Sequence, residues 1–515
     1  MKRNLNKLYK ICSMMASFSP GHLRLEDEDA FSWTHAYDSL GADIATNAMA
    51  LYAELLDGHK DSIVVDLACR AVIEDLVILN QFEESEGEQD IASIGTALVN
   101  QGRFLRSLQD ATNRIELDKP LPVVDFERTI RDTKKLIAKI LKVPYKQIEE
   151  DIEQETFFLR FCSKTKDIHT YAELVKRYGE TGHFEMHQFF SLRLHPNYVD
   201  DAEAEKIIQK TRDEYIEKTL QSLDYLVLYY NKFGPDAYPS YTAAKKKSLF
   251  RVGIGAPFYK GIDTLLRNPD FTPLDRWYLN KMESIFRSFS NLLSVSLYET
   301  ALSLIKPFLE INAFYDRMKK TDEESMTESF AVASISAFHE RLDLEEQNQR
   351  LRPRVRAVYE KKKPNIDKET FSKNLRGSLR YFLYDEEISY SKIMHRYFAD
   401  DNFNFMDKKL AVEFYLSVSA LAHAGYGYGY LDSIATEQVI ETTILLCAVD
   451  FMELFARYFT PRIDDYSKEA EAEADISAEL KCYVAGIAEI ANWLSERQNQ
   501  DVDQQGGEDD EDQLE

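Results

Sequence analysis

Residues 63–82 read IVVDLACRAVIEDLVILNQF. Apolar residues recur there at steps of three and four, and the run is too long for a single strand, so it predicts an α-helix. Arg70 and Glu74 stand four residues apart within it, which would place opposite charges on one helical face, one turn apart. This stretch thus predicts an apolar helix that carries a basic and an acidic side chain as neighbours.

Helical periodicity also dominates the rest of the chain, and strand-like alternation is scarce. Hydrophobic residues make up 44% of the 515 residues, which is enough to build real cores. We therefore predict an all-α protein. Further clear helical runs cover 48–56, 130–141, 202–230, 279–314, 408–422 and 436–459.

Four sequence anchors recur in the same order in the two halves of the chain, which indicates an internal duplication. The anchors are Arg70-x3-Glu74 with Lys306-x3-Glu310, Tyr171 and Tyr178 with Tyr390 and Tyr397, Ser191-x3-His195-x2-Tyr198 with Ser419-x3-His423-x2-Tyr426, and Asp224 with Asp450. We predict two tandem up-and-down helical bundles related by this duplication.

The chain divides at stretches that break the helical pattern. One stretch, 233–261, is rich in Gly, Pro and Lys, and the stretch from Gln498 onward is mostly Gln, Gly and acidic residues. We predict an N-terminal helical segment 1–29, module 1 at 30–232, a linker at 233–264, module 2 at 265–465 with a basic insertion at 350–363, a C-terminal helix within 466–497, and a disordered acidic tail at 498–515.

Each module is expected to gather a basic residue, a Glu, a Ser, a His and a Tyr between its helices. Pro196 and Gly425 should end the helices just after His195 and His423, where the helix dipole favours the imidazolium form. Such a cluster is either a paired polar network that fixes helix packing or an active site. The candidate catalytic residues are Arg70, Glu74, His195, Tyr198, Lys306, Glu310, His423 and Tyr426.

Two other segments carry chemistry of their own. His183 and His187 would share a helical face, which makes them weak metal candidates. The glutamate of an H-E-x-x-H site is missing, so we expect neither metal nor cofactor.

A basic segment could hold RNA phosphates if its alternating arginines were extended, or it could be a solvated loop that balances the acidic body. It contains Arg350, Arg352, Arg354, Arg356, Lys361, Lys362 and Lys363.

The formal net charge of −25, to which eight acidic residues after Gln500 contribute, limits the kinds of partner that the protein can bind. An acidic surface repels nucleic acid and anionic membranes, so an RNA site would have to be a local basic patch. The five cysteines are widely spaced and odd in number, which favours reduced thiols in a cytoplasmic protein. No run approaches the roughly 18 apolar residues of a membrane span, so no membrane partner is expected.

The R-x3-E helix, followed by a Tyr-rich helix and S-x3-H, resembles an uncharacterised family of bacterial all-helical domains that is distantly similar to the HEPN group. This resemblance implies a helical bundle and a role in phage defence or stress response. Some HEPN proteins are metal-independent ribonucleases with an R-x4-6-H motif. The nearest match here is Arg177 with His183, while His195 and His423 follow a serine instead of an arginine.

Two functions from different classes follow. Because no complete catalytic motif is present, we expect first a non-enzymatic interaction or regulatory protein. Its partner would be another protein or a second copy of itself, since an acidic surface suits a partner with a basic face. The alternative is a HEPN-like metal-independent ribonuclease effector that acts on RNA.

Overall fold

The computed structural model contains only helices, turns and loops in the part of the chain that it describes. The described residues are 33–56, 58–82, 88–114, 126–153, 168–233, 271–294, 297–321, 323–339, 342, 345–362, 389–399, 406–423 and scattered positions in 443–459. The prediction of an all-α fold is confirmed for these residues. The predicted segments 1–29, 466–497 and 498–515 and almost all of the linker 233–264 lie outside them.

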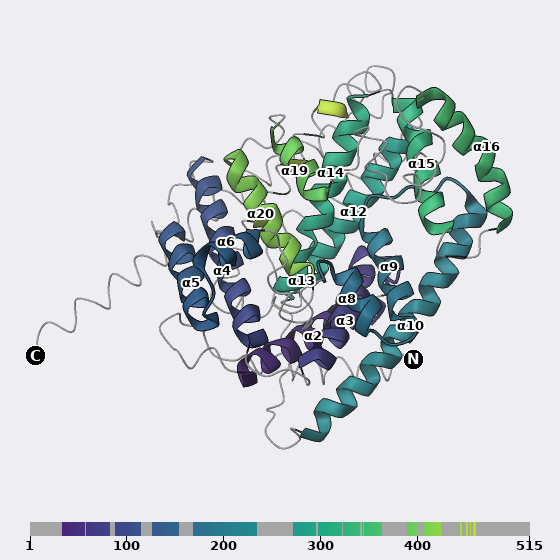
Figure 1. Ribbon diagram of the computed structural model, residues 1–515. Coiled ribbons are helices and arrows are strands. Elements are labelled where there is room, and N and C mark those ends of the chain that lie inside the picture. Colours follow the sequence, from purple (N-terminus) through teal and green to yellow (C-terminus); the bar gives the residue numbers. More distant parts are fainter. Residues whose placement is uncertain are drawn as a thin grey trace, which may run out of the picture.

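We describe the helices as two series along the chain, which are separated by residues 234–270 outside the described part. In Figure 1, α4, α5 and α6 lie on one side, α10, α15 and α16 on the other, with α3, α13 and α14 between them. The first series is α2 (Trp33–Leu56), α3 (Ile63–Phe82), α4 (Glu88–Arg114), α5 (Phe126–Leu141), α6 (Tyr145–Glu153), α8 (Tyr171–Tyr178), α9 (His183–Leu194) and α10 (Ala202–Phe233). The second is α12 (Pro273–Ser294), α13 (Tyr298–Ser303), α14 (Ile305–Lys319), α15 (Glu323–His339), α16 (Glu345–Lys362), α19 (Tyr390–Ala399) and α20 (Lys408–Leu421).

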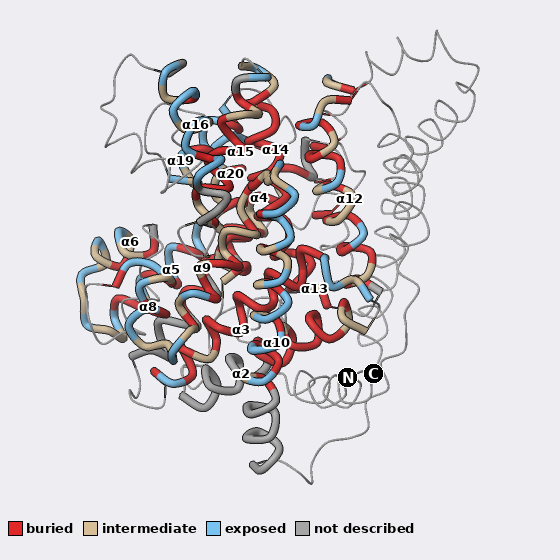
Figure 2. Tube along the Cα trace, turned by 90° about the vertical axis from the view of Figure 1, so that its right-hand side faces the viewer, coloured by how far each residue is buried: buried red, intermediate tan, exposed pale blue. Residues whose placement is uncertain are grey.

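The largest hydrophobic core contains buried residues from both series, from Ile44 to Phe459. Helices α3 and α14 lie inside it, and Figure 2 colours most of both as buried. Charged side chains on these two helices are therefore removed from water together with their apolar neighbours. Burial of a charge is unfavourable unless the charge is paired, so each of them needs a partner.

The prediction of one continuous helix over 279–314 is wrong. The structure has α12, α13 and α14 there, and α14 restarts at Ile305, with Leu304 between it and α13. Pro307 explains the restart, because proline lacks an N–H and is tolerated only in the first turn of a helix. The interruption places Lys306 in the first turn of α14, while Arg70 lies in the middle of α3.

The prediction of an extended or loop conformation for the basic segment is also wrong, because residues 345–362 form α16 with Pro353 inside it. Leu351 and Val358 are buried against α15, and this packing offsets the hydrogen bond that Pro353 cannot donate. Arg354 donates to Glu328 and, through both of its terminal nitrogens, to Asp200 at 2.7–2.9 Å.

The other arginines of α16 differ in their partners. Arg350 lies 3.2 Å from Glu203, Arg356 pairs with Glu360, and Arg352 is exposed. The side chains of Lys361, Lys362 and Lys363 lie outside the described residues. Within the described part of α16, the paired arginines thus favour the interpretation in which this segment balances the acidic body.

A buried carboxyl pair on α2 and α3 allows a first prediction. Asp75 is fully buried, its Oδ2 accepts from Asn47 at 3.1 Å, and its Oδ1 receives no hydrogen bond within the described structure. Burial first, and then the carboxylate of Asp43, raise the pKa of Asp75 well above its ordinary value. The folded protein therefore holds the proton of Asp75 more tightly than the unfolded chain does.

Asp75→Asn is expected to stabilise the protein. An unfolded aspartate titrates at about pH 3.9, so above this pH, up to the raised folded-state pKa, the folded protein binds more protons than the unfolded chain. The free energy of unfolding therefore falls as the pH rises through this interval, and the asparagine removes the fall. At pH 7 the gain should be on the order of 1 kcal/mol, the usual scale of a single substitution. Urea unfolding at pH 4 and 7 measures it, and a gain that is equal at both pH values would contradict the account.

Candidate functional site

Two charged pairs lie on the buried helices α3 and α14. Arg70 Nε is 3.7 Å from Glu74 Oε1, and their side chains are 2% and 0% exposed. Lys306 and Glu310 occupy the corresponding positions on α14 and are both buried. The charges of these four side chains shift the pKa values of the ionisable groups around them.

Each glutamate is paired with a histidine from the other half of the chain. Nδ1 of His195, at the C-terminal end of α9, lies 2.8 Å from Glu310 Oε2. Nδ1 of His423, two residues after α20, lies 3.2 Å from both carboxylate oxygens of Glu74. The expectation that His195 and His423 join the glutamates of their own modules is therefore wrong, because the two series share one core and their polar faces meet in it.

A second contact to each glutamate comes from its own half. His187 Nε2 lies 2.8 Å from Glu74 Oε1, and the hydroxyl of Tyr415 donates to Glu310 Oε1 at 2.8 Å. His187 precedes His195 by eight residues, and Tyr415 precedes His423 by eight. Each carboxylate is thus held by one side chain of its own half and one imidazole of the opposite half.

The tyrosines of the repeated Tyr-rich helices cover the two imidazoles, again across the halves. The ring of Tyr171, the first residue of α8, stacks on His423 with centroids 4.4 Å apart and planes inclined by 7°. The ring of Tyr390, the first residue of α19, stacks on His195 at 4.2 Å and 12°. Stacking fixes the plane of each imidazole, so the direction of its ring nitrogens is set by the tyrosine and the glutamate together.

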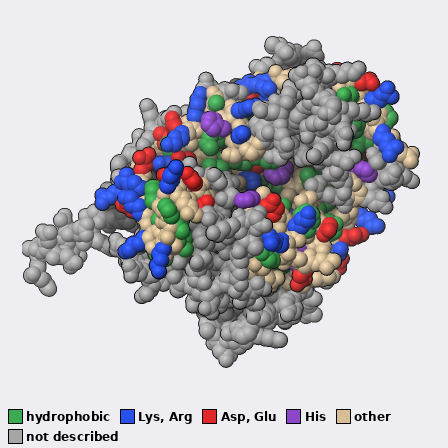
Figure 3. All heavy atoms as spheres, in the orientation of Figure 1, with side chains coloured by type: hydrophobic (Ala, Val, Ile, Leu, Met, Phe, Trp, Pro, Cys, Tyr) green, Lys and Arg blue, Asp and Glu red, His purple; other side chains and the backbone are tan. Residues whose placement is uncertain are grey.

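Arg70 contacts the opposite half, whereas Lys306 contacts a histidine of its own half. The guanidinium of Arg70 donates to the carbonyl oxygen of Ala422, and Lys306 Nζ lies 3.3 Å from His423 Nε2. Figure 3 shows histidine side chains beside acidic and basic ones near the middle of the face it presents. The side chains of His195 and His423 are 26% and 22% exposed, whereas both glutamates are buried. Water can thus reach the imidazoles more easily than the carboxylates.

Burial controls the charge of the imidazoles. It lowers the pKa of His423 to about 3, with Lys306 and Arg70 adding to the effect against the attraction of Glu74. Burial, aided by Lys306 and Arg70, likewise lowers the pKa of His195. The predicted preference for imidazolium at these helix ends is wrong, because a helix dipole contributes only about 0.3–1 kcal/mol at an exposed site and these rings are partly buried.

The carboxylates stay ionised for the opposite reason. Burial would raise the pKa values of Glu74 and Glu310, but the opposite imidazole, the basic residue four positions earlier and the hydrogen bonds hold both pKa values below 4.5. A neutral imidazole next to a carboxylate donates from Nδ1, so Nε2 carries the lone pair. Within the described chain His195 Nε2 has no hydrogen-bond partner.

The remaining candidates lie elsewhere. Tyr198 packs on Phe330 at 5.9 Å, and its phenol is near Asp200 and Arg354, so it is separate from the histidine–glutamate contacts. Tyr426 lies outside the described residues. The two weak metal candidates diverge, since His183 Nδ1 accepts from the backbone N–H of Glu180 while His187 turns to Glu74. Among the described residues no group of three metal-ligating side chains is found.

Four contacts of this site are not predictable from the motifs alone. The sequence indicates His187 only as a metal candidate, does not mark Tyr415, and does not predict that Tyr171 and Tyr390 stack on the imidazoles. The repeat contained one usable signal, because His187 and Tyr415 occupy the same offset before the repeated histidine. A hydrogen-bonding residue eight positions before the repeated histidine in both halves indicates that the two residues have equivalent partners.

Comparison with protein-family models, with curated proteins and with solved structures finds no match to this chain. The resemblance to HEPN-like domains therefore stays a prediction, and the duplication stays one too. None of the described helices has the length and apolar character needed to cross a membrane. The chemistry of the site is inferred below from its own geometry.

Proposed function

We propose that the crossed histidine–glutamate pairs form a metal-independent acid–base active site that cleaves RNA. The observation that carries this proposal is the contact between His195 Nδ1 and Glu310 Oε2 at 2.8 Å on a ring that is 26% exposed. A carboxylate on Nδ1 fixes the tautomer and leaves Nε2 to accept a proton, which is how histidine bases are oriented in hydrolytic enzymes.

The reaction needs a base, an acid and a positive charge near the phosphate. His195 Nε2 takes the proton of a ribose 2′-hydroxyl, and the oxygen attacks phosphorus. The bond from phosphorus to the 5′-oxygen then breaks, and this oxygen takes a proton from Lys306. Arg70 and Lys306 stabilise the negative charge that builds up on the phosphoryl oxygens. The products are a 2′,3′-cyclic phosphate and a 5′-hydroxyl end.

Two further observations support this assignment. Both cations act on both imidazoles, since the charges of Arg70 and Lys306 each lower the pKa values of His195 and His423. The histidine–glutamate contacts and the tyrosine–histidine stacks each occur once in each direction between the halves, and this reciprocity supports the proposed duplication. RNA is the substrate class that lets such a site work without metal, since the 2′-hydroxyl supplies the nucleophile.

The test is cleavage of a mixed set of single-stranded and hairpin RNAs by the purified full-length chain in EDTA. His195→Ala is expected to reduce the rate by about 10²–10⁴-fold, the usual contribution of a general base. His183→Ala, on the same helix but outside the site, is the matched control and should cleave normally. RNA substituted with 2′-deoxyribose should remain intact.

The pH profile gives an independent result. Because burial lowers the pKa of His195, the acid limb of kcat/KM should have its midpoint below pH 6.5. The proposal would be overturned if wild-type protein left all of the RNAs intact, or if His195→Ala cleaved them as fast as wild type does. That result would favour the non-enzymatic interaction protein expected from the sequence, in which the same contacts serve to hold the halves together.

A further inference from the structure

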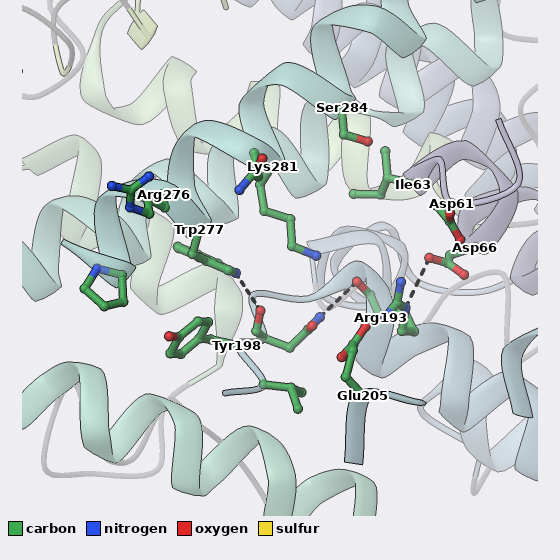
Figure 4. Close-up of a pocket in the computed structure, with 14 residues that line it drawn as sticks. Asp61, Ile63, Asp66, Arg193, Tyr198, Glu205, Arg276, Trp277, Lys281 and Ser284 are labelled. Atoms are coloured by element: carbon green, nitrogen blue, oxygen red, sulfur yellow. Dashed lines mark hydrogen bonds and ion pairs between the residues drawn. The ribbon is translucent and has the colours of Figure 1, made fainter. Parts of the chain in front are cut away.

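A cavity that is separate from the histidine–glutamate contacts lies between the two helical series. It has a volume of about 510 Å³ and is bounded by the start of α3, the end of α9 and the first half of α12. Figure 4 shows the side chain of Lys281 entering it from α12, with Trp277 on one side and Arg193 and Asp66 on the other. The indole N–H of Trp277 donates to the carbonyl of Asn197 at 2.6 Å and so fixes that wall.

The acidic side chains around this cavity already have basic partners. Asp66 accepts from Arg212 at 2.6 Å and lies 3.5 Å from Arg193, and Arg193 is also 3.8 Å from Glu205. Asp61 accepts from the amide of Gln209 at 2.9 Å. Lys281, in contrast, makes no hydrogen bond or ion pair with any residue in the described part of the chain.

We propose that Lys281 is a nucleophilic amine that captures a small aldehyde or ketone in this cavity as an imine. The amine adds to the carbonyl carbon to give a carbinolamine, and loss of one water forms the C=N bond, so no other reactant is needed. An imine-forming lysine needs a neutral amine that a carbonyl compound can reach, and burial or a neighbouring cation favours the neutral form. Lys281 is without a partner in the described structure, lines the cavity and feels the charge of Arg193.

The charge environment supports the geometry. Burial, and then the positive charge of Arg193, lower the pKa of Lys281 to about 8, although Asp66 and Glu205 act in the opposite direction. A substantial part of the amine is therefore neutral at physiological pH, and only the neutral amine attacks a carbonyl. Trp277 and Tyr198 offer flat apolar walls, which suit a carbonyl compound with a planar body.

The test uses 4-formylbenzoate with sodium cyanoborohydride, followed by peptide mass mapping of the full-length protein. At pH 7.5 Lys281 should be labelled roughly tenfold faster than Lys210, an exposed lysine on α10 that serves as the internal control. The labelling rate at Lys281 should rise with pH around a midpoint near 8. Because the mapping is done on the unaltered protein, it does not depend on how a variant folds.

Two variants separate imine formation from simple attraction of an anion. Lys281→Arg keeps a cation but cannot form an imine, and Lys281→Met removes the cation at similar length. Loss of the adduct in both variants is the expected result. The proposal would be overturned if Lys281 were labelled no faster than Lys210. It would also be overturned if the probe bound wild type and Lys281→Arg equally at equilibrium without forming any adduct. RNA cleavage by Lys281→Met should be normal, so either proposal can fail alone.

Discussion

Glu310→Gln is expected to slow RNA cleavage by about 10²–10⁴-fold, nearly as much as loss of His195 itself. The glutamine is close in shape, but it removes the negative charge that fixes the Nδ1–H tautomer of His195 and stabilises the imidazolium formed during the reaction. Single-turnover rates on the RNA that wild type cleaves best measure the effect. The loss should appear in kcat more than in KM, because Glu310 is buried and does not contact substrate.

Tyr415→Phe is the matched control for this experiment. It removes the other hydrogen bond to Glu310, the one at Oε1, but leaves the charge and the contact with His195 in place. A reduction smaller than about tenfold is expected, which is the scale of a single hydrogen bond of about 1 kcal/mol. If Glu310→Gln cleaved RNA at the wild-type rate, Glu310 would be a packing residue and the proposed role of His195 as an oriented base would be wrong.

Arg212→Met is expected to lower the free energy of unfolding by about 3–5 kcal/mol. Arg212 on α10 is fully buried, donates from Nε to Asp66 at 2.6 Å and donates from its terminal nitrogens to the carbonyls of Lys60 and Ser62. Methionine fills much of the same volume, so the loss reflects the unsatisfied carbonyls and the carboxylate of Asp66, which loses Arg212 and keeps the longer contact with Arg193. This side chain fastens α10 to the chain that enters α3.

Urea unfolding followed by circular dichroism measures this loss. The double variant Asp66→Asn with Arg212→Met should recover part of it, because no uncompensated charge is then buried. Arg128→Met, which removes an exposed arginine that pairs with Asp132 on α5, should change the free energy of unfolding by less than about 1 kcal/mol. An Arg212→Met protein as stable as wild type would show that the buried pair contributes nothing net.

Periodicity was sufficient to predict the fold class and several elements. The runs 63–82 and 202–230 correspond to α3 and most of α10, because apolar residues at steps of three and four have few alternatives in long segments. Boundaries set by single residues were missed. Pro307 splits a long apolar run into separate helices, and Pro353 is tolerated inside α16, where Leu351 and Val358 pack on α15.

The composition of the site was predicted in part, but its pairing was not. The repeat singled out Arg70, Glu74, His195 and their counterparts as polar residues in apolar helices. Sequence order suggests that neighbours along the chain pair with each other, whereas His195 lies on Glu310, 115 residues away. Only the packing of the two series into one core decides which carboxylate each imidazole meets. The ionisation of the imidazoles was missed for the same reason, because burial is a property of the whole fold.

The crossed pairing is tested most directly by double-mutant cycles on the free energy of unfolding, with histidine changed to alanine and glutamate to glutamine. The opposite-half pairs, His195 with Glu310 and His423 with Glu74, should show coupling energies above about 1 kcal/mol. The same-half pairs, His195 with Glu74 and His423 with Glu310, should couple by less than about 0.5 kcal/mol. Stronger coupling within each half than between the halves would contradict the exchange of partners on which the proposed active site depends.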